Sequence, residues 1–139
     1  MAIASFVNNL PAGLYHLPVG RKKEFSACGQ PVFEISLNQA ATAHEVLDRL
    51  GKTCNFPDWY GNNFDALHDC LTDPEWPAAS APPTLLIDGL DRLRHDIPET
   101  FSTLIDVLRS ACENRAADAR PLRIVLTTPA RGVPDLPGT

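Results

Sequence analysis

Two aspartates stand four residues apart in a segment without lysine or arginine, FPDWYGNNFDALHDCLTD at 56–73. A helical rotation of about 100° per residue divides this segment into two sides. The apolar side holds Phe64, Leu67 and Leu71. The polar side spans an arc of roughly 100° and holds Asp65, His68, Asp69 and Thr72. Like charges at this spacing destabilise a helix by about 0.2–0.5 kcal/mol, so we expect an interaction outside the helix to offset the cost.

Three kinds of chemistry suit such a face. Paired carboxylates can act as acid and base in glycoside hydrolysis, but two residues on one exposed face form a ridge rather than a cleft. Asp65, His68 and Asp69 have a spacing that suits a metal ion, but one helix rarely closes a metal site, and His44 and His95 lie in other elements. The ridge can also enter a basic pocket on another protein, with carboxylates in place of phosphates. The structural alternative is a solvated face with one carboxylate held by a distant arginine.

The charge distribution favours a basic partner. The net charge is −5, and the stretch from Thr53 to Asp91 contains seven acidic residues and no lysine or arginine. Such a stretch projects a negative field, which repels nucleic acid and attracts cations, unless the fold brings an arginine to it. A merely solvated acidic face remains the alternative on composition alone.

Local signals define the helices that position these residues. Asn62 or Asn63 suits the N-cap of the acidic helix, and Gly61 permits a tight entry. Thr42 and Glu45 form a capping box at the start of a helix over 41–51, where Gly51 predicts the end.

A longer helix is expected over 96–116, and a short helical segment is expected within 20–30. The apolar stripe of the longer helix is predicted to hold Phe101, Leu104, Ile105, Leu108, Ala111 and Cys112.

The predicted fold class is α/β, with a small three-stranded parallel sheet packed by helices. The strands are expected at 32–37, 84–90 and 122–128, where β-branched and apolar residues run together. Because strands alternate with helices, parallel pairing through right-handed crossovers is expected. The segment 13–19 is a candidate for an extra N-terminal strand.

Length and composition predict a single domain over 1–139, with 44% hydrophobic residues. There is no apolar run near 18 residues and no basic leader followed by an apolar core. The cysteines at 28, 54, 70 and 112 include no CxxC pair, so we expect four reduced thiols and a cytoplasmic protein.

The segment 56–73 closely resembles the signature helix of the barstar family of ribonuclease inhibitors. That pattern is an aromatic pair, Gly, a variable residue, Asn, an apolar residue, Asp-Ala-Leu, an aromatic, and Asp-Cys-Leu. The matching residues here are Trp59, Tyr60, Gly61, Asn63, Phe64, Asp65, Ala66, Leu67, Asp69, Cys70 and Leu71. A looser resemblance covers 31–128, which leaves an N-terminal extension (1–30) and a Pro- and Gly-rich tail (129–139) that is expected to be loose. Within the extension, Gly13 to Pro18 is similar to a segment of longer bacterial relatives.

The resemblance implies a protein that is not an enzyme and needs no cofactor. Its acidic helix and preceding loop would plug the active site of a cognate basic ribonuclease or nuclease toxin in a 1:1 complex, without binding nucleic acid or membrane. Asp69 would take the place of the scissile phosphate, and Asp65 would pair with a pocket arginine. The full set of expected partner-binding residues is Trp59, Tyr60, Gly61, Asn62, Asn63, Asp65, His68, Asp69, Thr72 and Asp73.

Two features depart from the family pattern. His68 stands where the family usually carries an aromatic, and the stretch 73–83 has its own sequence. The alternatives are a small enzyme or metal-binding protein using Asp65, His68 and Asp69, and a barstar-fold adaptor whose target is not a ribonuclease.

Overall fold

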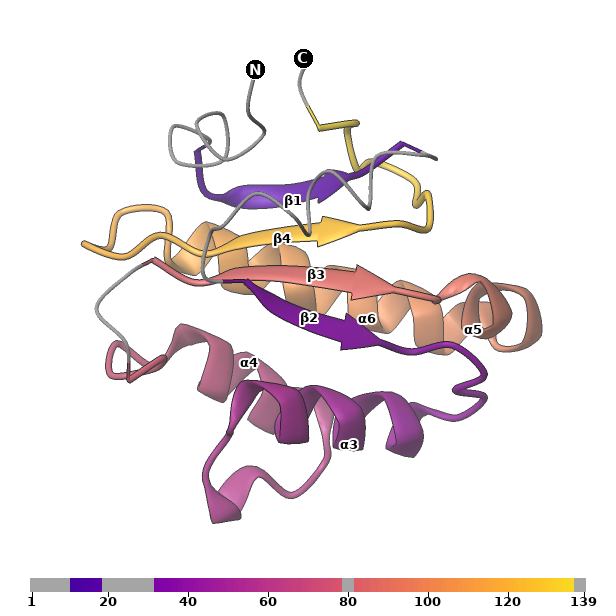
Figure 1. The fold of residues 1–139 in the computed structure, drawn as a ribbon, viewed down its shortest axis with the longest axis horizontal. Coiled ribbons are helices and arrows are strands. Elements are labelled where there is room, and N and C mark those ends of the chain that lie inside the picture. Colours follow the sequence, from indigo (N-terminus) through magenta and orange to yellow (C-terminus); the bar gives the residue numbers. More distant parts are fainter. Residues whose placement is uncertain (1–10, 19–31, 79–81, 137–139) are drawn as a thin grey trace.

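The computed structural model describes residues 11–18, 32–78 and 82–136. The expected helical segment at 20–30 lies outside these residues. The described chain forms a four-stranded parallel sheet in the order β1-β4-β3-β2 (Figure 1). The strands are β1 (Gly13–His16), β2 (Phe33–Ser36), β3 (Thr84–Asp88) and β4 (Arg123–Leu126). The α/β fold class is therefore confirmed, and the sheet has four strands because the N-terminal candidate strand pairs with β4.

Burial follows the position of each strand in the sheet. The central strand β4 is buried along its whole length, and β3 is buried up to Ile87. Their near-continuous apolar sequences predict this pattern, since a central parallel strand is covered on both faces. The edge strand β2 alternates instead, with Ile35 buried between exposed Glu34 and Ser36.

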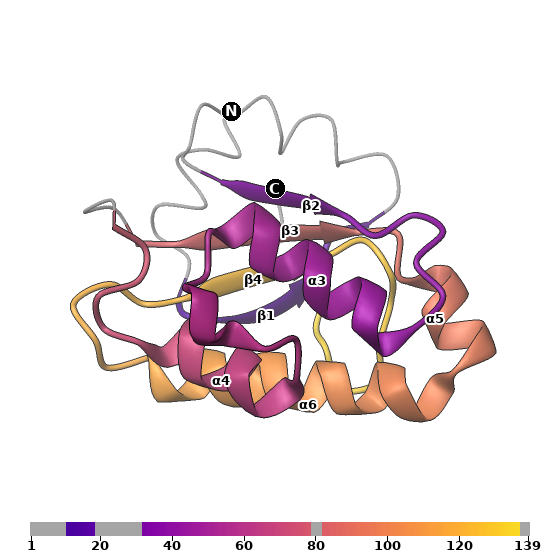
Figure 2. The same ribbon diagram turned by 90° about the horizontal axis from the view of Figure 1, so that it is seen from below.

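The helices cover one face of the sheet (Figure 2). They are α3 (Ala43–Cys54), α4 (Phe64–Thr72), α5 (Asp91–Asp96) and α6 (Pro98–Asn114), with a short 3-10 helix η1 (Asp58–Tyr60) before α4. Their apolar sides form the main core with one face of the sheet. A smaller cluster on the other face holds Leu17, Leu86, Val125 and Leu136.

The start of α3 confirms Thr42 as the N-cap, although Glu45 Oε1 accepts the amide of Ala41 at 3.2 Å rather than that of Thr42, and the end of the helix differs from the prediction. The Thr42 hydroxyl accepts the amide of Glu45 at 3.1 Å. The helix continues past Gly51 to Cys54, and Asn55 ends it in the left-handed conformation with φ 57°. Gly51 instead allows the Tyr60 ring to pack closely against α3, because a Cβ at this position would lie 2.6 Å from that ring.

The predicted apolar stripe of the long helix is confirmed, since all six of its residues are buried in α6. The helix occupies Pro98–Asn114 rather than 96–116, and the separate helix α5 before it was not predicted. Its sequence, DRLRHD, buries only Leu93, so it offers no apolar periodicity to detect.

The C-terminal tail, expected to be loose, contacts β1 up to Leu136. The amide of His16 donates to the Pro134 carbonyl at 2.8 Å, and the amide of Leu136 donates to the His16 carbonyl at 2.7 Å. His16 Nδ1 also lies 2.8 Å from Asp135 Oδ1. The tail is therefore ordered by β1, whose outer edge offers backbone groups to pair with.

Three cysteines of the described part, Cys54, Cys70 and Cys112, are free and buried, while Cys28 lies outside it. Burial raises the pKa of Cys54 and of Cys112 to about 12. Burial, together with the nearby Asp73 and Asp69 carboxylates, raises the pKa of Cys70 to about 11. These thiols stay protonated and unreactive at neutral pH.

We predict that the free energy of unfolding decreases as the pH rises from about 9 toward 12. Each buried thiol has a folded-state pKa above its unfolded value of 9.0, so its contribution is complete below that pH and is lost above it. Urea unfolding at about pH 8 and about pH 10.5 measures the effect. A variant with Cys54 and Cys112 replaced by Ala should show a shallower pH dependence, and an unchanged slope would contradict the assignment.

Candidate functional site

The loop before α4 fixes where the acidic helix begins. Gly61 and Asn62 adopt the left-handed region with φ 64° and 52°. Asn63 then takes an extended conformation, and its side-chain oxygen accepts the amide of Ala66 at 2.8 Å. Of the two candidates for the N-cap, Asn63 is therefore the one used. Asn62 instead donates to Asp48 Oδ1 on α3 at 3.4 Å.

The buried side of α4 is rotated relative to the predicted one. Its buried residues are Ala66, Leu67, Cys70 and Leu71. Phe64, expected on the apolar side, is only half-buried. The rotation arises because α4 packs against both α6 and α3, so two neighbours share its inner surface.

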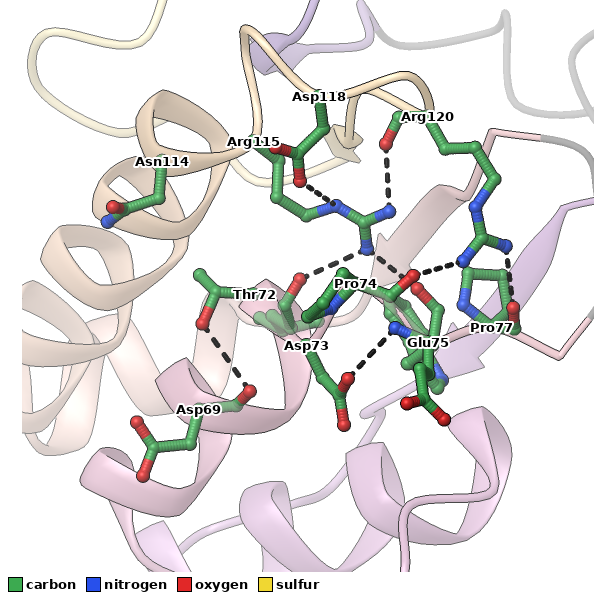
Figure 3. Close-up of polar contacts among 12 residues, drawn as sticks. Asp69, Thr72, Asp73, Pro74, Glu75, Pro77, Asn114, Arg115, Asp118 and Arg120 are labelled. Carbon is green, nitrogen blue, oxygen red and sulfur yellow. Dashed lines mark hydrogen bonds and ion pairs between the residues drawn. The ribbon is translucent and has the colours of Figure 1, made fainter.

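Asp65 and Asp69 lie exposed on the outer side of α4, as the periodicity predicts. Within the described residues, neither carboxylate has a hydrogen-bond or ion-pair partner. The Asp69 side chain carries no polar contact in Figure 3, whereas its backbone carbonyl lies 3.4 Å from Thr72 Oγ1. The structural alternative, in which a distant arginine holds one of the two carboxylates, therefore finds no support in this part of the chain.

His68 does not share the outward orientation that the sequence analysis assigned to it. It is half-buried, and its Nε2 lies 3.1 Å from Ser110 Oγ and 3.2 Å from Asn114 Nδ2, both on α6. The side chain thus belongs to the contact between α4 and α6. The half-buried Thr72 donates to the His68 carbonyl at 2.8 Å and closes the last turn.

The two aromatic residues of η1 have different environments. Trp59 is 57% exposed, the only large hydrophobic residue of the described chain with that much exposure. Tyr60 is buried, and its hydroxyl donates to the Leu47 carbonyl at 2.8 Å. Tyr60, expected among the partner-binding residues, therefore has a ring that is not on the surface but packs against α3 and anchors the loop.

Sequence analysis missed the anchors that lie after α4. Trp76 is buried, donates from Nε1 to the Cys54 carbonyl at 2.8 Å, and stacks on Phe33 with ring centroids 5.5 Å apart. The available signal was a tryptophan within a proline-rich stretch, since a tryptophan side chain can bury a large area and its N–H usually finds a hydrogen-bond partner when buried.

The fold does bring arginines to the acidic stretch, but they bind backbone carbonyls. Arg115 donates to the Leu71 carbonyl at 3.2 Å and to the Trp76 carbonyl at 2.9 Å (Figure 3). Arg120 donates to the carbonyls of Pro74 and Pro77, each at 2.6 Å. Burial, reinforced by the nearby Arg120 charge, lowers the pKa of Arg115 from its usual value.

The same geometry gives little support to an enzyme or a metal centre. No group of three or more His, Cys, Asp or Glu side chains in the described residues is placed to hold a metal ion. A cavity of about 500 Å³ lies between α3 and the segment 55–62, but neither Asp65 nor Asp69 lines it. In the part of the chain that the structure describes, no helix combines the length and apolarity needed to cross a bilayer.

The sheet, the helix order and the exposed acidic helix define a small α/β domain of the barstar type. Residues 30–127 match the family model described as barstar (barnase inhibitor), so the chain belongs to the barstar family. Members of this family are inhibitors of ribonucleases rather than enzymes. Among the curated proteins, no match to this chain was found. The strand β1 precedes the matched residues and extends the sheet at the β4 edge.

We predict that Asn63→Ala lowers the free energy of unfolding by about 1 kcal/mol, because the Ala66 amide loses its cap. Asn63→Ser is the matched control, since a serine oxygen also caps well and should retain most of the stability. Urea denaturation of the two variants and the unchanged chain measures the difference. Equal stabilities for the Ala and Ser variants would contradict a capping role.

Proposed function

We propose that this chain inhibits a cognate basic ribonuclease or nuclease toxin by inserting α4 into its active site. The observation that carries the proposal is the pair of exposed carboxylates, Asp65 and Asp69, without a partner in the described residues of a barstar-family chain. In the proposed complex Asp69 replaces the scissile phosphate, and Asp65 pairs with an arginine of the pocket. The proposed complex is 1:1 and forms in the cytoplasm, where it protects the producing cell.

The surroundings of the two carboxylates support this role. Trp59 supplies an exposed aromatic surface beside them, of the kind that often anchors protein interfaces. The exposed Gly61 and Asn63 and the half-buried Asn62, Thr72 and Asp73 surround the pair on either side. Tyr60 and His68 act from behind this surface, since their side chains pack on α3 and α6.

The direct experiment is titration of the purified chain against barnase and against any small basic nuclease domain encoded in the adjacent reading frame. Stoichiometric loss of ribonuclease activity supports the proposal. Turnover of a substrate by the isolated chain, or a metal ion retained after purification, would favour the alternative small enzyme or metal-binding protein that uses Asp65, His68 and Asp69.

We predict opposite effects for two substitutions on α4. Asp69→Ala should leave folding intact or slightly improved, because a like charge and a weak helix former are removed. It should weaken inhibition by about 2–5 kcal/mol or more, since a buried cation of the nuclease loses its partner. Leu67→Ala should lower the free energy of unfolding by about 2–5 kcal/mol through a core cavity while leaving binding by the folded fraction nearly unchanged. His68→Ala should fall between the two variants, with a modest loss of affinity for the nuclease.

Thermal melts and inhibition constants for these variants provide the test. Glu99→Ala is the matched control for Asp69→Ala, because it removes an equal charge from an exposed position on α6. If Asp69→Ala unfolds the chain yet the folded fraction inhibits normally, Asp69 is a structural residue and the phosphate-mimic proposal fails.

We predict that the association rate falls as salt is added. The acidic stretch from Thr53 to Asp91 has no lysine or arginine, and the arginines brought to it are bound to carbonyls rather than to Asp65 or Asp69. Salt at 0.15 M screens charges over about 8 Å, which weakens long-range steering. Stopped-flow mixing across a salt series measures this, and a constant association rate would exclude steering.

A further inference from the structure

Two arginines from the region after α6 hold the chain that follows the acidic helix. Arg115 immediately follows α6, and its side chain is 1% exposed. Its Nη1 reaches the carbonyls of Leu71 and Trp76, and its Nη2 donates to the Arg120 carbonyl at 2.8 Å (Figure 3). One guanidinium therefore links the last turn of α4, the segment after it, and the loop that leads into β4.

Arg120 completes this arrangement from the same loop. It donates from Nη2 to the Pro74 carbonyl and from Nη1 to the Pro77 carbonyl. Neither proline has an amide hydrogen, so the segment 74–77 is poorly equipped to bond to itself. Four backbone carbonyls between Leu71 and Pro77 are thus fixed by two side chains.

The free-energy cost of burying the charged guanidinium of Arg115 indicates a role other than stabilising the fold. Its acidic contact, Asp118 Oδ2, lies 3.6 Å from Nε, and that carboxylate side chain is 40% exposed. Much of the positive charge is therefore balanced by carbonyl dipoles, including one at the negative end of α4. Apolar residues of similar volume often stabilise a fold as well as a buried charge does, whereas they cannot fix the direction of several carbonyls at once.

The fixed carbonyls lie next to the proposed binding residues. Leu71 follows Asp69 by two residues, and Asp73 begins the held segment, with its Oδ1 accepting the Glu75 amide at 2.9 Å. The hydroxyl of Thr72 donates to the His68 carbonyl in the same turn. The end of α4 is therefore held both by the Thr72 hydroxyl, from within the helix, and by Arg115, from the residue after α6.

We propose that Arg115 and Arg120 are positioning residues of the binding site, which hold the end of α4 and the segment 73–77 in the binding conformation before a partner arrives. This inference rests on the proposed inhibitor function. A surface that is ordered in advance loses less conformational freedom on binding, and such effects act mainly on the dissociation rate. The two arginines thereby set the lifetime of the complex without touching the nuclease.

The experiment uses the full chain and compares two variants of the positioning arginines, called the clamp variants, with two control variants. Arg120→Ala removes the donors to Pro74 and Pro77, and Arg115→Lys keeps the charge but removes the planar fork. Val125→Ala is the stability control, because Val125 is buried in the small cluster on the other face of the sheet. Arg92→Ala is the charge control, because Arg92 pairs with Asp96 on α5, away from the segment 69–77 in the sequence.

Two measurements are made on every variant. Amide hydrogen exchange of the free chain reports order in 69–77 without any partner. Dissociation from barnase, the ribonuclease named in the family description, reports the lifetime of the complex. Both clamp variants should exchange faster in 69–77 and dissociate about tenfold faster, with little change in the salt dependence of association, whereas both controls should match the unchanged chain in both respects.

The outcomes separate this inference from the proposed function. Failure of the unchanged chain to bind barnase counts against the proposed function for that nuclease, while exchange in the free chain still decides whether the arginines order 69–77. Normal binding with unchanged dissociation in both clamp variants overturns the inference and leaves the inhibitor function intact. Faster dissociation in Val125→Ala as well would mean that global stability, rather than the clamp, sets the lifetime.

Discussion

An exposed helix face whose two carboxylates have no partner among the described residues must be held in place by its other sides. Asp65 and Asp69 repel each other and contribute nothing to the core, so α4 depends on packing and capping for its order. Leu67 and Leu71 are completely buried beneath it, Asn63 caps its start, and Arg115 binds a carbonyl near its end. The rest of the fold supplies these three constraints, which together leave the outer face free for a partner.

The electrostatics of the site follow from which groups the arginines bind. A guanidinium paired with Asp65 or Asp69 would have neutralised the face that the sequence makes acidic. Arg115 and Arg120 satisfy backbone carbonyls instead, so they add rigidity close to the site while leaving its carboxylates accessible.

The sheet shows how an addition to the family core is stabilised. The strand β1 lies outside the residues that match the family model and pairs with β4. A further parallel strand creates a new edge, which is open to unwanted pairing. Residues 134–136 cover this edge through their bonds to His16. Strand β1 and residues 134–136 therefore form one structural unit on the side of the sheet away from β2.

Sequence reasoning succeeded wherever the signal was local. The cap at Thr42, the stripe of α6 and the outward orientation of Asp65 and Asp69 all follow from signals within one element. The cap of α4 is narrowed to Asn62 or Asn63 in the same way, and the structure uses Asn63. It failed wherever a distant element decided the outcome. Gly51 marks the approach of the Tyr60 ring rather than a helix end, and His68 turns toward Ser110 because α6 offers it a partner.

The same division explains why the exposed residues proposed for binding could be predicted and the residues that support them could not. A residue that contacts a partner must lie outward on its own element, which periodicity can show. A residue that positions it from behind is chosen by tertiary contact, as with Arg115, which lies 44 residues from the Leu71 carbonyl that it binds. The pattern of residues within one element does not reveal a contact between residues so far apart in the chain. In this fold, therefore, the acidic face is predictable from the sequence, whereas the arginine contacts that hold the end of α4 become visible only in the structure.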